Sequence, residues 1–248
     1  MSLWSRLIWR VYAKSYDGIR QLLPYQQLYQ GVLSAADIKP FDRVIDIGAG
    51  TGNSRAYAGA GASWLLVDQI PAMLRRARRK FVDDPRVQTQ RLDFTDPRER
   101  DNIVPGYSVC LSVNALYCDP DPVGHLTWLH RIAAPAARLV LAGPWQNGDM
   151  KAIIAEHRRQ RIVQQHKPRI WWLLIKNLPV YLINRWYLQP RMTTVHSCPA
   201  SAKQLASWLN QAGWQIMSLQ SAYAGTAYLV LAHKQPEELT WATINDDA

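Results

Sequence analysis

Short apolar runs recur along the first 145 residues and alternate with longer amphipathic stretches. A short apolar run that ends in glycine or another turn residue is typical of a buried strand of a parallel sheet. Five such runs predict strands at 43–48, 63–68, 87–93, 108–116 and 138–144, with helices between them. Because strands that alternate with helices form parallel sheets with right-handed crossovers, this region predicts an α/β domain.

The chain before and after these strands has a different pattern. Residues 3–16 predict an amphipathic helix, and a second helix is expected at 24–36. In the first helix the apolar residues that recur at helical spacing include Leu7 and Val11, whereas Arg10 and Lys14 share another face. A helix at 201–213 is followed by two strands, 214–222 and 226–234, which should pair antiparallel because few residues separate them.

The composition is that of an ordinary globular chain of 248 residues, 48% of them hydrophobic. The three cysteines form no C-x-x-C pair and the six histidines have no metal-ligand spacing, so we expect no metal site and no disulfide framework. No stretch approaches the roughly 20 apolar residues that span a bilayer, and the first residues do not resemble a signal peptide. These features predict a cytoplasmic protein.

The net charge of +10 is concentrated in one segment. Between Lys151 and Arg191 there are nine basic residues and one acid, Glu156. Such a local excess of cations favours an anionic partner.

The strongest candidate for chemistry is the segment VIDIGAGTGN at 44–53, which follows a predicted strand and begins a helix. Its glycines permit a tight turn and the close approach of a ligand to the backbone. Asp68 ends the next predicted strand, 22 residues after Asp46, where a carboxylate can accept both hydroxyls of a ribose. Asn53 occupies the last glycine position of a G-x-G-x-x-G fingerprint, and no G-K-[ST] ending follows, which disfavours a nicotinamide or flavin site and excludes a P-loop.

These motifs resemble those of class I S-adenosylmethionine-dependent methyltransferases of the small-molecule type, over about 35–145 and again over 201–234. The resemblance implies S-adenosylmethionine as the cofactor. It places the glycine segment and the acids that end the second and third strands around the cofactor, with the segment after the fourth strand at the methyl-transfer site. The cofactor-binding residues implied are Tyr16, Asp46, Gly48, Gly50, Gly52, Asp68, Gln69, Asp93, Phe94 and Asn114.

The resemblance also implies the fold and the division of the chain. The fold class is α/β, a Rossmann-like doubly wound sheet of seven strands with a terminal antiparallel strand pair, N-terminal helices and a helical insertion after the fifth strand. The chain forms one methyltransferase domain, 1–248. Its parts are an N-terminal helical lid (1–36), a cofactor-binding core (37–145), a basic Trp-rich insertion (146–200), a closing helix and strand pair (201–234) and a tail (235–248).

No residue is assigned as the catalytic base, because methyl transfer from a sulfonium chiefly requires alignment of the reacting groups. His125, His130 and Tyr117 are candidates, and a histidine on an amphipathic helix such as His130 is more often structural. The N-P-P-[YF] motif of amino-methylating enzymes that act on nucleic acids and protein glutamine is absent after the fourth strand.

The insertion contains the segment 168–191, in which aromatic and aliphatic residues alternate with cations. Three interpretations stay open: these residues enclose a substrate or a dimer interface, they contact an anionic membrane surface, or they bind nucleic acid. Leu and Ile runs count against RNA. The expected substrate-binding residues are Tyr117, Trp145, Trp171 and Trp172.

The expected activity is methyl transfer to a small, lipophilic acceptor, at a membrane surface in one version of the hypothesis. The alternatives are an RNA methyltransferase and a non-catalytic protein that keeps the fold to bind ligands. Monomer and homodimer both stay open.

Overall fold

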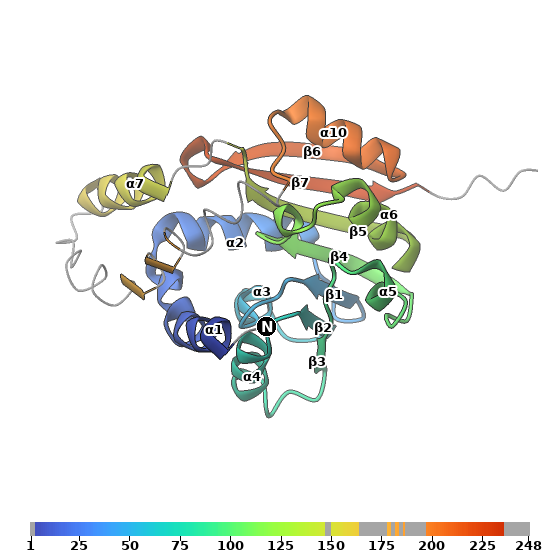
Figure 1. Cartoon of the computed structure of the whole chain (residues 1–248). Helices are drawn as coiled ribbons and strands as arrows, with labels where there is room; N and C mark the ends of the chain where they lie inside the picture. Colours follow the sequence, from blue (N-terminus) through green and yellow to red (C-terminus); the bar gives the residue numbers. More distant parts are fainter. Residues whose placement is uncertain are drawn as a thin grey trace, which may run out of the picture.

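The computed structural model describes residues 3–146, 150–163, 178–179, 182–183, 186 and 197–235. Seven strands form one sheet in the order β3-β2-β1-β4-β5-β7-β6 (Figure 1). Their bounds are β1 (Arg43–Ile47), β2 (Ser63–Asp68), β3 (Val87–Arg91), β4 (Tyr107–Val113), β5 (Ala133–Pro144), β6 (Trp214–Ala222) and β7 (Ala227–Lys234). Strands β1 to β5 pair in parallel, and β7 lies antiparallel between β5 and β6. The predicted Rossmann-like sheet and its terminal antiparallel pair are confirmed.

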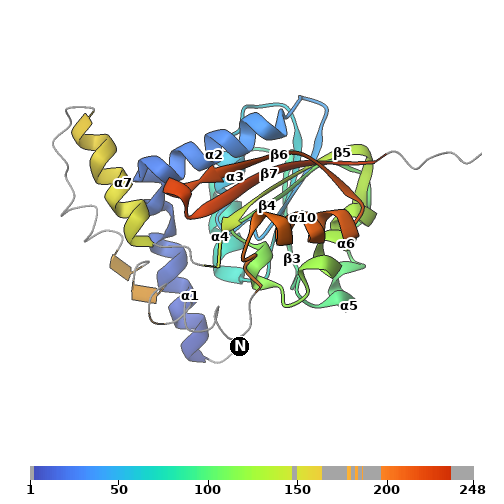
Figure 2. The same ribbon diagram turned by 90° about the horizontal axis from the view of Figure 1, so that it is seen from above.

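Helices cover both faces of this sheet, as the view from above shows (Figure 2). Their bounds are α1 (Leu3–Tyr16), α2 (Leu23–Ala36), α3 (Asn53–Tyr57), α4 (Pro71–Lys80), α5 (Pro97–Arg100), α6 (Pro122–Ile132), α7 (Met150–Val163) and α10 (Ala202–Gln211), with single 3-10 turns η1 (Asp17–Gln21), η2 (Leu116–Cys118) and η4 (Tyr223–Gly225). Helices α2, α3 and α4 pack on one face and α6 and α10 on the other. The connection after β1 runs to β2, toward one edge of the sheet, and the connection after β4 runs to β5, toward the other edge. Ligands of open α/β sheets bind at the carboxyl ends of two such strands.

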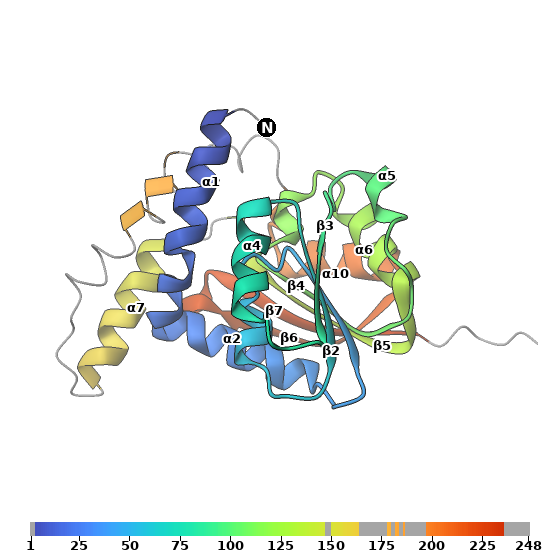
Figure 3. The same ribbon diagram turned by 90° about the horizontal axis from the view of Figure 1, so that it is seen from below.

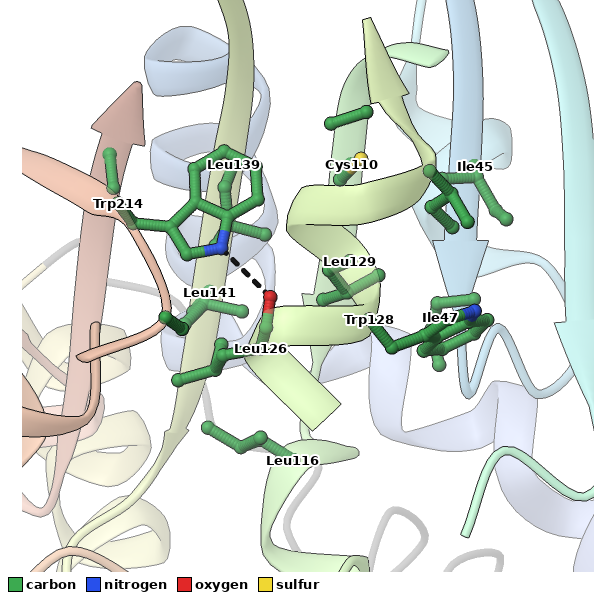
Figure 4. Close-up of a cluster of buried hydrophobic side chains, with 14 of the residues drawn as sticks. Ile45, Ile47, Cys110, Leu116, Leu126, Trp128, Leu129, Leu139, Leu141 and Trp214 are labelled. Carbon is green, nitrogen blue, oxygen red and sulfur yellow. Dashed lines mark hydrogen bonds between the residues drawn. The ribbon is translucent and has the colours of Figure 1, made fainter. Parts of the chain in front are cut away.

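The central strands are buried on both faces, which explains their continuous apolar sequence. In β1, Ile45 and Ile47 pack toward α6 and α10, whereas Val44 packs toward α2. Figure 4 shows the first of these clusters, in which the indole of Trp214 donates a hydrogen bond to the carbonyl of Leu126 at 3.0 Å. This bond satisfies the polar atom of a fully buried side chain and ties β6 to α6.

Helix α1 does not lie on the sheet but against the start of α4. Its buried residues are Tyr12 and Ala13, with Trp9 and Tyr16 packed beside them. Leu7 and Val11 are exposed, on the same side as Arg10 and Lys14. The helix is therefore confirmed, but the expectation that Arg10 and Lys14 lie on another face than Leu7 and Val11 was wrong. Positions 7, 10, 11 and 14 have the i, i+3, i+4, i+7 spacing that places them in one stripe, and nothing in the helical period shows whether that stripe is covered.

The segment after β5 begins with α7, which packs against α2, where the backbone N–H of Leu23 donates to Nδ1 of His157 at 3.1 Å. A helix therefore opens the insertion expected at 146–200. Within the part of the chain that the structure describes, no helix combines the length and the apolar character needed to cross a bilayer.

Candidate active site

The glycine-rich segment forms a turn between β1 and α3 in which three glycines adopt left-handed backbone conformations. Gly48, Gly50 and Gly52 have φ of +71°, +57° and +75°. A Cβ atom on Gly48 would lie 2.3 Å from Cβ of Ala115, and one on Gly52 would lie 2.6 Å from the ring of Phe81. On Gly50 the nearest atom would be on the ring of Tyr16, 3.7 Å away. Gly48 and Gly52 thus let neighbouring elements approach, and Gly50 leaves room for a ligand beside the backbone.

Asp68, the last residue of β2, fixes this turn from the side. Its Oδ2 accepts a hydrogen bond from the backbone N–H of Gly50 at 2.8 Å, and its Oδ1 accepts one from the N–H of Ile70 at 2.7 Å. Burial raises the pKa of the Asp68 carboxyl to about 6, although both hydrogen bonds oppose that rise. Each carboxylate oxygen keeps a second lone pair, so Asp68 can hold the glycine turn and still accept from two hydroxyls.

Asp46 lies behind the same turn and is almost completely buried, with 1% of its surface exposed. Burial, and to a lesser degree the nearby Asp68, raises the pKa of Asp46 to about 7, against a hydrogen bond from Ser54. Within the described residues Oδ2 of Asp46 has no hydrogen-bond partner. A buried acceptor without a donor is costly, and a ligand that brings N–H or O–H groups to the turn would satisfy it.

Strand β4 ends one residue before Asn114, which has φ of +55° and whose backbone N–H donates to the carbonyl of Ala142 at 2.7 Å. Burial raises the pKa of Tyr223, and the nearby side chain of Asn114 offsets part of that rise. Tyr223 and the next residue, Ala224, also have positive φ, 47° and 56°. Because β6 runs in the direction of β4, the end of β4 and the turn between β6 and β7 lie at the same edge of the sheet as the glycine turn.

The N-terminal helices complete the site with tyrosines. Tyr16 lies over Gly50, and its pKa is raised by burial and lowered in part by the nearby Tyr25. The ring of Tyr25 stacks on that of Tyr223 at 6.4 Å, and its hydroxyl accepts from the side-chain amide of Asn53 at 3.0 Å. Contacts therefore connect the glycine turn through α1 and α2 to the turn between β6 and β7. Tyr223 in turn lies near Asn114 at the end of β4.

Asp17 joins the N-terminal segment to the core beside this site. Its carboxylate accepts from Oγ1 of Thr51 at 2.5 Å, from Nε of Arg76 at 3.0 Å and from Nζ of Lys80 at 3.2 Å. Partial burial opposes ionisation, but the hydrogen bond from Thr51 and the charge of Lys80 outweigh it and lower the pKa of Asp17. Lys80 also donates to Asn53 at 3.0 Å. One carboxylate thus fastens η1 to the glycine turn and to α4.

Three more of the expected cofactor-binding residues follow β2 and β3. Oδ1 of Asp93 accepts from the backbone N–H of Thr95 at 3.1 Å and from its hydroxyl at 2.6 Å, so Asp93 closes the turn after the strand. Phe94 is buried and lies near Gly48. Gln69 is partly exposed between Asp68 and Ile70. All three therefore lie at the carboxyl edge of the sheet that the glycine turn occupies.

Of the histidines considered as bases, neither lies in this ring of contacts. His125 is fully buried, with Nδ1 3.0 Å from Asp119 and its ring edge-on to Phe94. Burial lowers the pKa of His125, and Asp119 offsets part of that effect. His130 lies toward the other end of α6, edge-on to Trp214. His125 therefore packs against the ring of Phe94, and His130 packs against Trp214 in the core.

The expected substrate-binding residues are distributed unevenly. Tyr117, in η2, is partly exposed and close enough to Tyr12 and Tyr16 to interact with them electrostatically. Trp145 packs on Tyr228 of β7, with ring centroids 5.0 Å apart. Trp171 and Trp172 lie outside the described residues. Of the expected substrate-binding residues that the structure describes, Tyr117 lies near the tyrosines of the N-terminal helix.

Sequence reasoning missed several of the tyrosines that surround the glycine turn. They are Tyr12, Tyr25, Tyr29 and Tyr223. The pairs 12/16 and 25/29 have the i,i+4 spacing that places two rings on one helix face. The turn between β6 and β7 could have been placed as well, because β6 runs in the direction of β1 and therefore ends at the same edge of the sheet.

Comparison with known proteins identifies the class to which this site belongs. Residues 17–219 match the family described as methyltransferase domain, which is most of the chain. The chain therefore belongs to the methyltransferase domain family, and it is an S-adenosylmethionine-dependent enzyme of class I. A search of the curated proteins found none that match this chain.

Solved structures support the fold. A chain from the complex of the Haloferax volcanii Trm112 methyltransferase activator with a methyltransferase has a TM-score of 0.64 and 14% identity, covering 92% of this chain and 97% of that one. An S-adenosylmethionine-dependent methyltransferase from Aquifex aeolicus has a TM-score of 0.54 and 14% identity over 88% and 93%. The [4+2]-cyclase SpnF, at 0.57 and 13% over 85% and 81%, shows that the same fold also serves a different reaction.

Proposed function

We propose that this enzyme transfers the methyl group of S-adenosylmethionine to a small, uncharged, lipophilic acceptor. The observation that carries the proposal is the tyrosine-rich surrounding of the glycine turn on the side of the N-terminal helices. Burial raises the pKa of Tyr25 and Tyr29 well above the ordinary value, so these hydroxyls stay neutral at physiological pH. Among the residues that the structure describes, Arg76 and Lys80 lie beside the glycine turn and both form ion pairs with Asp17. Such surroundings favour an apolar acceptor over a phosphate-rich one.

The residues present suit the cofactor. Gly50 leaves room beside the backbone, Asp68 can accept from the ribose hydroxyls, and Asp46 offers an acceptor to the amino acid end or its surroundings. When bound, S-adenosylmethionine supplies the activated methyl group. The contribution of this chain is to orient both molecules and to exclude water with the side chains of Tyr16, Asn114 and Tyr223.

The proposal extends to the location of the enzyme. We place it in the cytoplasm and peripherally on a membrane, where a lipophilic acceptor is concentrated. Free thiols at all three cysteines agree with a reducing compartment. An exposed apolar and cationic face of α1 supports membrane contact.

The first experiment is calorimetric titration of the protein with S-adenosylmethionine and S-adenosylhomocysteine. Asp68→Asn removes the charge and one acceptor pair, and it should weaken binding about 10- to 100-fold, the range expected for lost hydrogen bonds to a charged group. Asp68→Ala should weaken binding at least as much, but it also leaves the N–H groups of Gly50 and Ile70 without their acceptor. Asp83→Asn, at an exposed acid in the turn after α4, is the matched control and should change nothing.

The second experiment offers radiolabelled S-adenosylmethionine to a lipid extract and to RNA. Label in the lipid extract supports the proposed acceptor class. Label in RNA with salt-sensitive binding would establish the RNA methyltransferase instead. Wild-type affinity retained in Asp68→Asn would refute the site assignment, and cofactor binding without transfer to either extract would support a non-catalytic binding protein.

A further inference from the structure

Helix α1 has two functional faces. On the inner face, Tyr12 and Ala13 are buried and Tyr16 reaches Gly50. On the outer face, Leu7 is 51% exposed and Val11 42%. Large apolar side chains exposed next to one another on a helix call for an explanation when the same helix touches the active site.

The outer face is also cationic. Positions 7, 10, 11 and 14 follow the helical repeat, so Arg10 and Lys14 lie in one stripe with Leu7 and Val11. Both cations are exposed, and within the described residues neither forms an ion pair with an acid. Helix α4 lies beside α1 (Figure 3) and exposes three further arginines, Arg75, Arg78 and Arg79.

Residues of the insertion extend this surface on the other side of α1. Ile183 packs against the cluster around Tyr12, which places this part of the insertion beside the helix, as Figures 1 and 3 also show. Leu178, Leu182 and Trp186 are 46%, 41% and 76% exposed. Exposed apolar side chains therefore occur both on α1 and on a segment of the insertion that packs beside it.

We propose that this surface, formed by Leu7, Arg10, Val11, Lys14, Leu178, Leu182 and Trp186, docks on an anionic lipid bilayer. This docking surface rests on the proposed function, because docking is useful to the enzyme if its acceptor is lipophilic. It adds which face of the molecule contacts the membrane. Leucine, valine and tryptophan side chains enter the headgroup region favourably, and lysine and arginine attract anionic lipid at the same depth. An RNA partner would use the cations but would leave the aliphatic side chains without a role.

Docking would bring the active site to its acceptor. One helix carries both the outer face and Tyr16, which lies over the glycine turn. A bilayer-bound α1 therefore holds the turn close to the lipid, so an acceptor dissolved in the bilayer need not cross water to reach the site. The cations of the surface match the anionic headgroups, and its apolar side chains match the hydrocarbon beneath them.

The first test is flotation of the full chain with vesicles of phosphatidylcholine, alone and mixed with phosphatidylglycerol. The wild-type protein should float with the anionic vesicles. Arg10→Gln/Lys14→Gln should bind them about 30-fold more weakly, from about fivefold for each cation near the surface. The control is Arg131→Gln/Lys203→Gln, which removes two exposed cations from α6 and α10 on the other face of the sheet and should bind as the wild type does.

The apolar contribution is tested with Leu7→Ser/Val11→Ser, which should also reduce flotation, about tenfold or more. Its control is Phe41→Ser/Val104→Ser, because these residues are more exposed but lie at the opposite, amino-terminal edge of the sheet. Every variant is also titrated with S-adenosylhomocysteine, and unchanged affinity shows that the fold and the cofactor site are intact.

The outcomes separate the docking surface from the proposed function. Loss of flotation in both α1 variants, with unchanged cofactor affinity, supports the docking surface. Cofactor binding without wild-type flotation overturns the docking surface alone, whereas flotation without cofactor binding overturns the proposed function alone. Flotation unaffected by the α1 variants, salt-sensitive RNA binding that they abolish, or a dimer that they dissociate would each assign the surface to something other than lipid.

Discussion

Asp46 has a buried carboxyl group whose ionisation opposes folding. Its pKa is about 7 in the folded protein, above the value of about 3.9 expected in the unfolded chain. Folding therefore favours the protonated form, and the stability that this provides is present below about pH 4 and is lost as the pH rises through 7. We expect Asp46→Asn, which stays neutral, to be more stable than the wild type at pH 8, by about 2–4 kcal/mol since one pKa unit is about 1.4 kcal/mol.

The measurement is thermal unfolding of both proteins without ligand from pH 4 to pH 8. The difference in stability should grow with pH, and the same substitution should weaken S-adenosylmethionine binding, because Asp46 is kept for a ligand at a cost to stability. Asp101→Asn, at an exposed acid, should follow the wild type at every pH. Parallel curves for the wild type and Asp46→Asn would show that Asp46 carries no such cost.

Individual residues could be predicted from the sequence where the backbone demands one residue type. The glycines at 48, 50 and 52 were predicted to form a tight turn, and their positive φ values confirm it, because only glycine adopts that conformation without strain. Tyr223 adopts a positive φ without being glycine, and nothing in its identity reveals that conformation. Asn114 also has a positive φ, which asparagine adopts more often than other non-glycine residues, so its identity is only a weak signal. Their pairing depends on where the sheet places two distant turns, which spacing does not show.

At the scale of elements, the attachment of η1 to the core determines how firmly the N-terminal helices cover the site. Asp17→Ala removes the acceptor of Thr51, Arg76 and Lys80 together. The ion pairs are partly exposed, so we expect a loss of only about 1 kcal/mol in global stability. Hydrogen exchange in α1 and η1 should become faster, and the affinity for S-adenosylhomocysteine should fall about fivefold, because ligand binding must then also order this segment.

A matched control for Asp17→Ala exists on the same face of the sheet. Asp84 forms a similarly exposed ion pair with Arg55, but it joins the turn after α4 to α3 and does not attach η1. Asp84→Ala should cost comparable stability without changing exchange in α1 or the affinity for the ligand. Equal effects of both substitutions would mean that Asp17 acts only through general stability.

The existence and order of the elements could be predicted because the central strands are buried on both faces. Strand β1 contributes Ile45 and Ile47 to the hydrophobic cluster on one face of the sheet and Val44 to the cluster on the other face. This burial on both faces explains the continuous apolar run in the sequence. The orientation of α1 could not be predicted, because an exposed apolar stripe and a buried one have the same periodicity. What decides between them is the position of α4, a contact between segments about 60 residues apart.

At the scale of the molecule, the site is assembled from segments that extend from Tyr16 to Tyr223. The sheet topology brings them together, because β1, β4 and β6 end at one edge and the N-terminal tyrosines cover that edge. A ligand that contacts several of these segments should stabilise them as one unit. The fold and the site therefore form one cooperative structure. The stability that a bound ligand adds should appear in the unfolding of the whole domain.

Calorimetric unfolding with S-adenosylhomocysteine tests this cooperativity. At a concentration 100-fold above Kd a ligand that binds only the folded state adds about 2.7 kcal/mol, which corresponds to an increase in Tm of about 5–10 °C for a domain of this size. We expect a single transition that moves by this amount in the wild type and in Asp83→Asn. In Asp68→Asn, where binding is about 10- to 100-fold weaker, the same concentration should raise the Tm by only about 1–6 °C. If α1 and α2 unfolded separately, the ligand would shift one of two transitions and leave the other in place. That result would show that the N-terminal helices close over a core that is already complete without them.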